Sequence, residues 1–502
     1  MLRLLLALSA ALLLPALLAA QSFDFSRLDT LFERRFQEAK YPGLVYGVVS
    51  GGKLVHVKSF GQSNRTTPTP VDAKTVFRIA SMTKSFTVLA ILKLRDEGKL
   101  SLEDPVRKFI PAAQGLALPT QDSPSLTVRH LLTHSAGFPE DNPWGDRQLD
   151  IPDTTLDRWL QQGFPFSTAP GTAYEYSNYG FALLGRIVTS ASGMDYRQYL
   201  ERHILAPLGM NASTLEASEV PPARRAQGYG LRDGQYFDIA SLPHGAFGAM
   251  GGLHTTAEDL AKYVAFHLSA FPPRNDAESG PVKRSSVREM QQLQRLGGLS
   301  AQLGGKQPGA RVSGYGFGLG VSQDCQFGHV VGHGGGLPGF GSYMMWLPEY
   351  GVGMFAMANL TYAGLAGTIR DSLLLLEKEG AIRPRPLETK PTLLAVQAEL
   401  VSLWQDPKPA TLEAIAADNL FQDEPLDLRL SRLNTLRQTH KNCRATSLVP
   451  ENWLRGEFRL ECAEGGPLLV DFTLAPTNPP QVQHLTFRPA RSSDLPSSRC
   501  QP

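Results

Sequence analysis

The sequence contains little cysteine, few charged residues and few long hydrophobic runs. Only 4 of its 502 residues are cysteine, and charged residues make up 19%. No CxxC pair occurs, so the patterns of a thioredoxin-like redox site and of a cysteine zinc site are absent. Neither GxSxG nor HExxH occurs, which argues against the nucleophile elbow of the α/β-hydrolases and the common zinc-protease helix.

The balance of charge disfavours nucleic acid as a partner. Lys and Arg number 49 and Asp and Glu number 47, for a formal net charge of +2. Such a chain has no overall positive field with which to bind phosphate backbones. With 42% hydrophobic and 9% aromatic residues, it has enough apolar side chains for a sizeable core. Its length favours two or more domains.

The longest apolar run lies at the N-terminus. Met1-Leu2-Arg3 carries one positive charge, Leu4 to Leu18 is almost entirely Leu and Ala, and Ala19-Ala20 precedes polar sequence. This order is typical of a secretory signal peptide covering residues 1–20. A membrane anchor is the alternative, but the run is short for a span. We therefore expect a periplasmic or secreted protein that contacts a membrane only through this signal.

The region from residue 21 to residue 380 has strand patterns at both ends and helical patterns between them. Leu44–Ser50 and Lys53–Phe60, joined by Gly51-Gly52, predict a hairpin. The other expected strands are Tyr315–Ser322, His329–Gly332, Phe340–Leu347 and Val352–Ala358, and helices are expected at Ser26–Lys40, Ser81–Glu97 and Ile369–Glu379. We therefore expect an α/β (α+β) fold: an antiparallel sheet from both chain ends, an inserted helical lobe and a cleft between them.

A second, smaller domain is expected after a proline-containing linker at 381–392. Residues 393–502 combine two helical patterns, Leu393–Trp404 and Leu412–Ala417, with strand patterns near 435–448, 456–463, 467–474 and 482–488. This predicts a small α+β domain, and no catalytic pattern is found in it. The four cysteines allow three pairings. A hairpin turning at Asn452-Trp453 would place Cys443 opposite Cys462 and favours that pair.

Ser81-Met82-Thr83-Lys84 opens the predicted helix that is apolar on most faces. Residues three apart share a helical face, so the Ser81 hydroxyl and the Lys84 amine are expected to meet. A serine hydroxyl needs a neighbouring base, and a lysine among apolar side chains can lose its charge near neutral pH. The same spacing at Ser50 and Lys53 crosses a hairpin turn, where the two side chains would not share a face.

Two further segments offer groups that could complete such a site. Tyr176-Ser177-Asn178 lies in a loop before an apolar helix; a tyrosine near a cationic lysine has its pKa lowered and can relay a proton, and an asparagine can orient an amine or a substrate amide. His333-Gly334-Gly335-Gly336 is expected at the end of a strand. Its glycines would let a substrate backbone lie along the strand edge and leave an N–H free to stabilise an oxyanion.

The order Ser-x-x-Lys, Tyr-x-Asn, His-Gly-Gly resembles the serine β-lactamase and penicillin-binding-protein superfamily. It is most similar to class C β-lactamases and their esterase and peptidase relatives. Residues 25–380 carry the resemblance, and the C-terminal domain does not. The supporting segments are Phe77–Lys84, Leu131–Gly137, Pro170–Asn178 and Gly332–Phe340.

The resemblance implies a role for each of these residues. Ser81 would be the acylated nucleophile, Lys84 the proton acceptor and Tyr176 a partner base acting on the leaving group or the deacylating water. Asn178 would hold the substrate or Lys84. The backbone N–H groups of Ser81 and Gly336 would form the oxyanion hole, and His333, Gly334 and Gly335 would line the bound substrate.

The third motif departs from the usual Lys-Thr-Gly of the family. His333 replaces the lysine and Gly334 replaces the hydroxyl residue, and in the usual motif these side chains help to hold a substrate carboxylate. Because histidine is only partly charged at pH 7 and glycine has no hydroxyl, carboxylate recognition is expected to weaken. An esterase, or a peptidase of another specificity, therefore fits better than a strong β-lactamase or D-Ala carboxypeptidase.

We therefore expect an exported serine hydrolase that acts through an acyl-enzyme on a small-molecule or peptide ester or amide. Its activity would be that of an esterase, a D-amino-acid peptidase or a β-lactamase-like enzyme. The alternative is a penicillin-binding or sensor module that keeps the pocket but turns over little. A third possibility is a lobe that anchors a functional C-terminal domain. The natural substrate and the oligomeric state stay open at this point.

Metal and cofactor sites have weaker support. His130 and His134 are four residues apart, a spacing that binds zinc on some helices, but no third ligand accompanies them. Gly334-x-Gly336-x-x-Gly339 matches a dinucleotide fingerprint as a string, yet it contains a proline and precedes a strand rather than a helix. We expect no metal and no cofactor.

Overall fold

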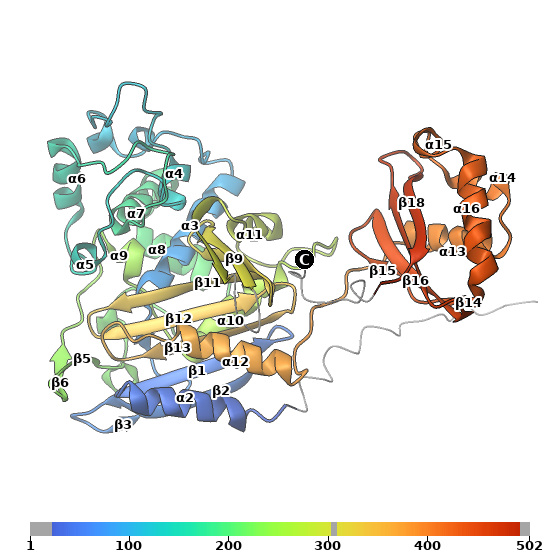
Figure 1. Cartoon of the computed structure of the whole chain (residues 1–502). Helices are drawn as coiled ribbons and strands as arrows, with labels where there is room; N and C mark the ends of the chain where they lie inside the picture. The colour runs from blue at the N-terminus through green and yellow to red at the C-terminus, as the bar shows by residue number, and fades with distance from the viewer. Residues whose placement is uncertain (1–22, 303–308, 492–502) are drawn as a thin grey trace, which may run out of the picture. The chain divides into compact units, whose positions relative to one another are not determined.

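The computed structural model describes residues 23–302 and 309–491, and the chain divides between Pro384 and Arg385 into two compact units (Figure 1). The signal peptide expected at 1–20 lies outside the described residues. Among the helices that are described, none combines the length and the apolar character needed to cross a bilayer. Each unit is described separately below.

The first unit is built on a nine-stranded antiparallel sheet with the order β3-β2-β1-β13-β12-β11-β10-β9-β8. Because β1 pairs with β13, the two ends of this unit meet in the middle of the sheet, as the sequence predicts. The strands are β1 Gly43–Ser50, β2 Lys53–Asn64, β3 Thr69–Pro70, β8 Arg295–Gln302, β9 Gly309–Tyr315, β10 Gly320–Asp324, β11 Gly328–Leu337, β12 Phe340–Leu347 and β13 Val352–Ala358.

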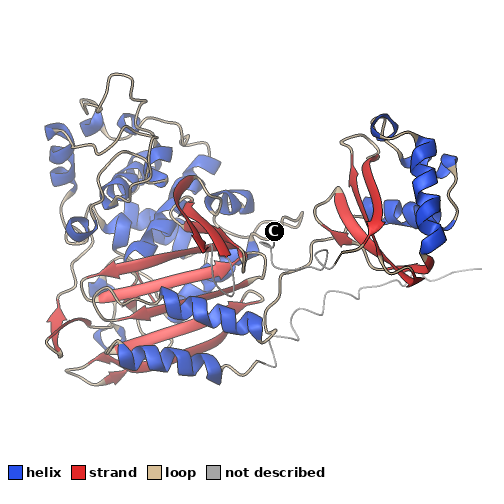
Figure 2. Cartoon of the chain, viewed as in Figure 1, coloured by secondary structure: helices blue, strands red, loops and turns tan. Residues whose placement is uncertain are grey.

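Helices cover both faces of this sheet. Along β1, Val45 and Val49 face the core shared with the helical lobe, whereas Tyr46 and Val48 face the core under α2 and α12. Figures 1 and 2 show α2 and α12 side by side on one face. The helices are α2 Ser26–Glu38, α3 Thr83–Asp96, α4 Val128–Leu132, α5 Asn142–Gly145, α6 Asp153–Gln162, α7 Asn178–Ser192, α8 Tyr196–Leu200, α9 Gly248–Gly251, α10 Ala257–Ser269, α11 Arg284–Met290 and α12 Ala366–Lys378.

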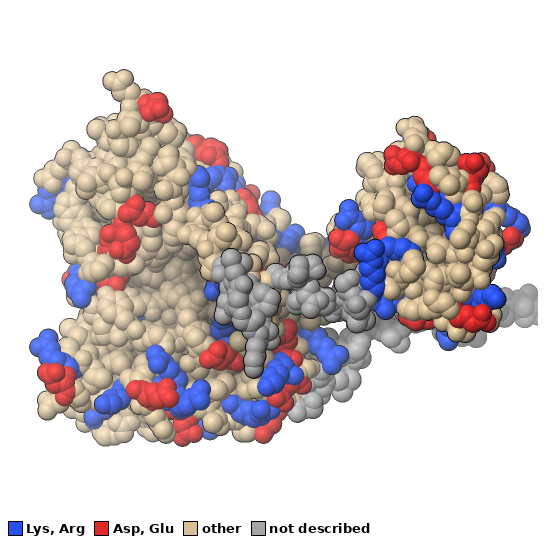
Figure 3. Space-filling model, in the orientation of Figure 1, with Lys and Arg blue, Asp and Glu red and all other residues tan. Residues whose placement is uncertain are grey.

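Helix α3 runs through the interior of the helical lobe. Eleven of its fourteen residues are buried, including Lys84. Two short antiparallel pairs, β4 Phe77–Arg78 with β7 His254–Thr255 and β5 Gly228–Arg232 with β6 Gln235–Ile239, complete the unit. Figure 3 shows this unit hollowed between the helical lobe and the sheet.

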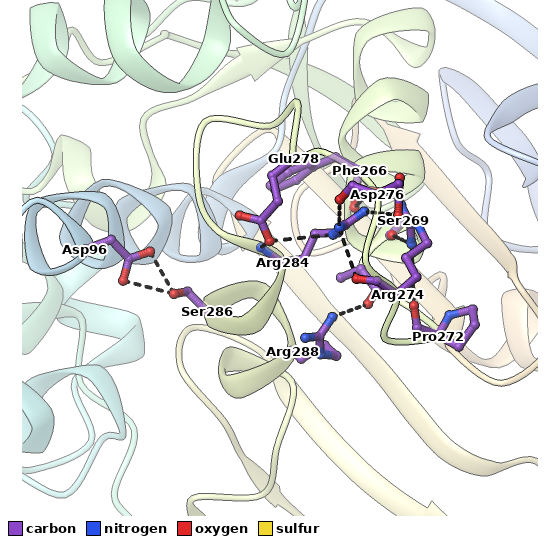
Figure 4. A network of polar contacts seen from close by, with 11 residues as sticks. Asp96, Phe266, Ser269, Pro272, Arg274, Asp276, Glu278, Arg284, Ser286 and Arg288 are labelled. Carbon is purple, nitrogen blue, oxygen red and sulfur yellow. Dashed lines mark hydrogen bonds and ion pairs between the residues drawn. The ribbon is translucent and has the colours of Figure 1, made fainter. Parts of the chain in front are cut away.

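A polar network fastens α11 to the C-terminal end of α3 (Figure 4). The Ser286 hydroxyl donates to the Asp96 carboxylate at 2.7 Å. Arg284 is nearly buried and donates to Asp276 at 2.8 Å, and its backbone N–H donates to Glu278 at 3.1 Å. Every charge in this group has a partner, so the network orders the loop before α11 and supports the helix that carries Lys84.

Several predicted strands of the first unit have other bounds in the structure: β1 begins at Gly43 and β2 continues to Asn64. The run Tyr315–Ser322 is not one strand: β9 ends at Tyr315 and β10 begins at Gly320, because Gly318 adopts a left-handed conformation (φ 66°) that turns the chain. The run His329–Gly332 continues to Leu337, so the His333 segment lies inside β11 rather than at its end. The hairpin of β8 and β9 was not predicted.

The second unit packs helices on an antiparallel sheet of order β14-β16-β17-β18, with β15 beside β16. A disulfide joins Cys443 to Cys462 directly opposite on β14 and β16, which confirms the favoured pair. Cys500 lies outside the described residues. The elements are α13 Pro391–Gln405, α14 Pro409–Ile415, α15 Leu420–Asp423, α16 Leu426–Thr439, β14 Lys441–Ala445, β15 Val449–Pro450, β16 Arg455–Glu464, β17 Leu468–Leu474 and β18 Val482–Pro489.

One strand prediction in this unit is wrong over its first part. Residues 435–439 belong to α16, and only residues 441–445 of the expected strand 435–448 form β14. Leu426, Leu430, Leu433 and Leu436 recur at helical spacing and pack into the core, which gives α16 its buried face.

Candidate active site

Ser81 lies in a tight turn that both lobes hold in place. The turn Ala80–Met82 is a single 3₁₀ turn before α3, so Ser81 precedes the α-helix instead of opening it. Ala80 has φ 49°, a left-handed conformation that a non-glycine residue keeps only where its surroundings enforce it. The Ile79 N–H donates to the Leu253 carbonyl at 2.9 Å, and the Ile79 carbonyl accepts from Ser342 at 2.8 Å.

The Lys84 amine sits directly beside the Ser81 hydroxyl. Lys84 Nζ lies 3.1 Å from Ser81 Oγ, 2.6 Å from Asn178 Oδ1 and 3.1 Å from the Met250 carbonyl oxygen. Its side chain is wholly inaccessible to solvent. The three neighbours therefore hold the amine in one place, with the hydroxyl as one of its three partners.

Burial changes the charge of this amine. Removal from water lowers the pKa of Lys84 to about 7, although the carboxylates of Asp146 and Asp141 act in the opposite direction. An amine with this pKa is uncharged in much of the population at neutral pH, and its lone pair can then accept the Ser81 proton. Lys84 therefore has both the position and the basicity of a general base.

Tyr176 completes this group, but with a different electronic character from the one expected. Its hydroxyl shares a hydrogen bond with Ser81, and its ring centroid lies 4.8 Å from Lys84 Nζ. Burial raises the pKa of Tyr176 well above its usual 10, so the expected lowering is wrong. The desolvation of a phenolate outweighs the hydrogen bond with Ser81, which acts in the opposite direction. Tyr176 is therefore a neutral phenol that can pass a proton.

Asn178 is the first residue of α7 and is held from several sides. Its Oδ1 accepts from Lys84, and its Nδ2 donates to Asn142 Oδ1 at 3.1 Å, which fixes the orientation of the amide. The backbone N–H groups of Asn178 and Tyr179 donate to the Asp141 carboxylate at 2.6 and 2.8 Å. Asp141 thus satisfies the free N–H groups at the start of α7 and keeps Asn178 against Lys84.

The three consecutive glycines of β11, Gly334 to Gly336, let the strand approach the Ser81 turn. A Cβ on Gly335 would collide with the Ile79 carbonyl and the Ser342 hydroxyl, and a Cβ on Gly336 would lie 2.6 Å from the Tyr362 ring. Parts of the protein itself therefore occupy the space beside Gly335 and Gly336. The pairing of β10 with β11 ends at Gly332, so among the described strands the backbone of β11 from His333 onward pairs only with β12. This leaves one backbone edge for an oxyanion.

Gly335→Ala is expected to disrupt the site and lower stability. The added methyl group must displace backbone before Ser81, and overpacking of this kind costs about 1–3 kcal/mol. We expect a lower Tm in thermal denaturation and a loss of hydrolysis. Gly367→Ala is the matched control, because a Cβ at this position in α12 meets nothing within 4 Å and alanine favours helix. Equal melting temperatures for Gly335→Ala and the unmodified protein would contradict the close packing.

His333 is neutral, in contrast to the partial charge expected from its sequence context. Its Nδ1 lies 2.6 Å from the Gly334 carbonyl and its Nε2 lies 2.8 Å from the Tyr315 hydroxyl. These contacts assign the Nδ1–H tautomer, which accepts from the tyrosine. Burial and the nearby charge of Lys84 lower the pKa of His333 to about 4. Both ring nitrogens are occupied, so this side chain offers no cation to a substrate carboxylate.

The two histidines with zinc-like spacing have separate contacts. His130 Nδ1 accepts from the Thr127 N–H at 3.2 Å, and His134 Nδ1 accepts from the Ser177 N–H at 3.0 Å. The His134 ring centroid lies 4.2 Å from that of Tyr176. Among residues 23–302 and 309–491, no three His, Cys, Asp or Glu side chains form a group that could hold a metal ion. His134 thus supports the Tyr176 loop.

Sequence reasoning missed several residues around the site. They are Asp141 and Asp146 beside Asn178, the Met250 carbonyl beside Lys84, Tyr315 beside His333 and Tyr362 beside Gly336. Asp141 and Asp146 flank the short helix α5, Asn142–Gly145, and no local pattern there indicates a contact with Asn178. No local pattern could have found the others, because their partners are far away in the chain.

The sheet, the inserted helical lobe and the serine–lysine–tyrosine site define a protein of the β-lactamase and penicillin-binding-protein kind. A sequence model of the Beta-lactamase family matches residues 28–377, and this chain belongs to that family.

Its relatives include a penicillin-binding protein. Protein flp of Staphylococcus aureus strain MW2 is 29% identical over 337 residues, a match that covers 66% of this chain and 63% of the relative. Penicillin-binding protein 4* of Bacillus subtilis is 27% identical over 335 residues, covering 63% of this chain and 68% of the relative. This chain therefore spans less than two thirds of the length of the Staphylococcus relative.

Solved structures share the fold. The octameric penicillin-binding protein homologue from Pyrococcus abyssi has a TM-score of 0.60 and 23% identity, and the match covers 93% of this chain and 99% of that one. A class C beta-lactamase has a TM-score of 0.56 and 22% identity and covers 70% of this chain and 96% of its own. At these identities, the likeness establishes the fold alone.

Proposed function

We propose that this chain is an exported serine hydrolase that forms an acyl-enzyme at Ser81 with ester or amide substrates. The observation that carries the proposal is the buried Lys84 amine, 3.1 Å from Ser81 Oγ and 2.6 Å from Asn178 Oδ1. A buried, partly uncharged amine that hydrogen bonds hold beside a hydroxyl is the arrangement that activates a serine nucleophile.

The proposed reaction has two stages. In the first, neutral Lys84 accepts the Ser81 proton while Oγ bonds to the acyl carbon, and the resulting oxyanion accepts from the N–H groups of Ser81 and Gly336. Collapse of this intermediate breaks the bond to the leaving group, which takes a proton from Tyr176. Lys84 returns its proton to Tyr176. In the second stage, water attacks the acyl carbon by the same proton transfers and restores Ser81.

The third motif favours substrates without a carboxylate next to the scissile bond. His333 is neutral and both of its ring nitrogens have partners, while Gly334 has no hydroxyl. A carboxylate held there would have no opposite charge to replace its lost hydration. We therefore propose an esterase, or a peptidase that does not read a free C-terminus, rather than a strong β-lactamase.

Export is proposed from the sequence alone. The basic start, apolar run and small residues of positions 1–20 have the order of a cleaved signal. A periplasmic or secreted location follows from it, and N-terminal sequencing of the protein recovered from the producing cells would test the cleavage near residue 20.

The test of the proposed function is covalent labelling of Ser81. Intact-mass and peptide mass spectrometry after exposure to a fluorophosphonate, a nitrophenyl ester and a penicillin should place an adduct on Ser81, and the ester adduct should turn over. A penicillin adduct that persists, with no substrate released from any ester or amide, would favour the binding or sensor module. If no reagent modifies Ser81, the proposal is wrong.

A further inference from the structure

A hydrogen bond links the helical lobe to the sheet beside the proposed site. The Tyr362 hydroxyl, from the loop between β13 and α12, donates to Asp146 Oδ2 at 2.8 Å in the loop after α5. The Tyr362 ring lies against Gly336, where a Cβ would be 2.6 Å from it. One side chain therefore touches both the strand of the proposed oxyanion hole and the helical lobe.

The loop that carries Tyr362 holds it in an unfavourable conformation. Tyr362 has φ 52°, which is unusual for a large side chain. Its N–H donates to the Phe340 carbonyl at 3.2 Å, and the preceding Thr361 hydroxyl donates to the Tyr229 carbonyl at 3.0 Å and accepts from the Gly339 N–H at 2.8 Å. Strain that neighbouring contacts enforce in this way is typical of functional positions.

Asp146 connects this tyrosine to the proposed base. The residue is 3% exposed, and its Oδ1 lies 3.5 Å from Asn178 Nδ2, at the limit of a hydrogen bond. Asn178 Oδ1 in turn accepts from Lys84 at 2.6 Å. A continuous chain of contacts therefore runs from Lys84 through Asn178 and Asp146 to Tyr362, whose side chain is 46% exposed.

Few charges face Lys84. Ser81, Tyr176, Asn178 and the Met250 carbonyl are uncharged partners, and burial keeps the pKa of both His134 and His333 below the usual value for histidine. The carboxylates that act on it are Asp146 and Asp141. The Asp141 carboxylate accepts hydrogen bonds from the N–H groups at the start of α7. Asp146 is therefore the carboxylate whose protonation can respond to Tyr362.

We propose that Asp146 is a positioning residue that holds Asn178 and sets the charge of Lys84, and that Tyr362 keeps Asp146 ionised and in place. This inference rests on the proposed function of Ser81 and Lys84. A substrate group that contacts Tyr362 beside Gly336 thereby acts on the proposed base without touching it.

The direction of the effect follows from the charges. Burial raises the pKa of Asp146 to about 6, and Asp141 acts in the same direction. The Tyr362 hydrogen bond and the charges of Lys84 and Arg147 favour its charged form, so Asp146 is mostly anionic at pH 7. Its negative charge stabilises the Lys84 ammonium. Removing that charge lowers the pKa of Lys84, and the neutral base then persists at lower pH. Removing only the Tyr362 hydroxyl makes the ionised form of Asp146 less stable. The pKa of Lys84 then also falls, but by less than in the absence of the Asp146 charge.

The test measures how fast a fluorophosphonate labels Ser81 as a function of pH in the full chain, because this readout needs no natural substrate. Asp146→Asn should move the acid limb of the rate profile to lower pH by about one unit. Tyr362→Phe should move it in the same direction by less. Asp150→Asn removes an exposed carboxylate four residues away and should leave the limb unchanged.

The outcomes separate the inference from the function beneath it. In one outcome, Asp146→Asn and Tyr362→Phe label more slowly at every pH but keep the acid limb at the same pH as the unmodified protein. This would show a merely structural role and overturn the inference. A shift to higher pH would also overturn it. If Asp146→Asn does not fold, Tyr362→Phe, altered at a half-exposed side chain, decides alone. Failure to label Ser81 in the unmodified protein at any pH would instead refute the proposed function.

Discussion

Ser81→Ala is expected to abolish acyl-enzyme formation and to lower ester hydrolysis by about 10⁴-fold or more, because no other group takes over the bond to the acyl carbon. The Ser81 hydroxyl lies 3.1 Å from Lys84 Nζ, which can accept its proton, and it shares a hydrogen bond with Tyr176. The residual rate would come from substrate binding and the oxyanion hole.

The measurement is turnover of nitrophenyl esters together with intact mass after labelling. Ser50→Ala is the matched control, since Ser50 has the same spacing to a lysine, Lys53, but sits at a hairpin turn at the end of β1. Ser50→Ala should retain full activity. A Ser81→Ala protein with undiminished turnover would show that another residue is the nucleophile.

Lys84→Met is expected to lower the acylation rate by about 10³-fold, within the range typical for loss of a general base. Methionine fills a similar volume but cannot accept the Ser81 proton. In the unmodified protein the rate should fall as the pH drops through about 7, because protonation then removes the lone pair of Lys84. The variant should lose this acid limb as well as most of its rate.

Single-turnover acylation across a pH series measures both effects. The control variant is Lys93→Met, which changes a lysine of the same helix that pairs with Glu97 at 3.0 Å near the surface. It should leave the acylation rate and the acid limb of its pH profile almost unaltered. An acid limb near pH 7 that survives in Lys84→Met would assign the titration to another group and contradict the proposed base.

The nucleophile and its base could be named in advance because their relation is local. Ser81 and Lys84 are three residues apart, and the rise of a single helical turn is enough to bring them together. The β1–β2 hairpin and the Cys443–Cys462 pair are local in the same sense, each set by a turn between two strands. Patterns within about twenty residues thus predicted contacts that the structure contains.

The errors came where local patterns were extended into three dimensions. The Tyr315–Ser322 run was read through a glycine turn, and the helix at residues 435–439 was read as strand. The pKa of Tyr176 was expected to fall because a cation lies nearby, yet burial raises it. His333 was expected to be partly charged, and its buried surroundings make it neutral. In both pKa errors the depth of the site, which no short motif encodes, decides the result.

The order of residues along the chain was sufficient for the class of fold, the serine–lysine pair and the β1–β2 hairpin. These depend on neighbours within a few residues, where helical and strand periodicity control which side chains share a face. Folding decided the rest: the 3₁₀ turn at Ala80–Met82, the charge of Lys84 and the link from Asp146 to Tyr362. Those properties arise from burial and from contacts between groups that can be more than two hundred residues apart in the chain. Because packing excludes water, the buried side chains differ in charge and hydrogen bonding from the same side chains in solution.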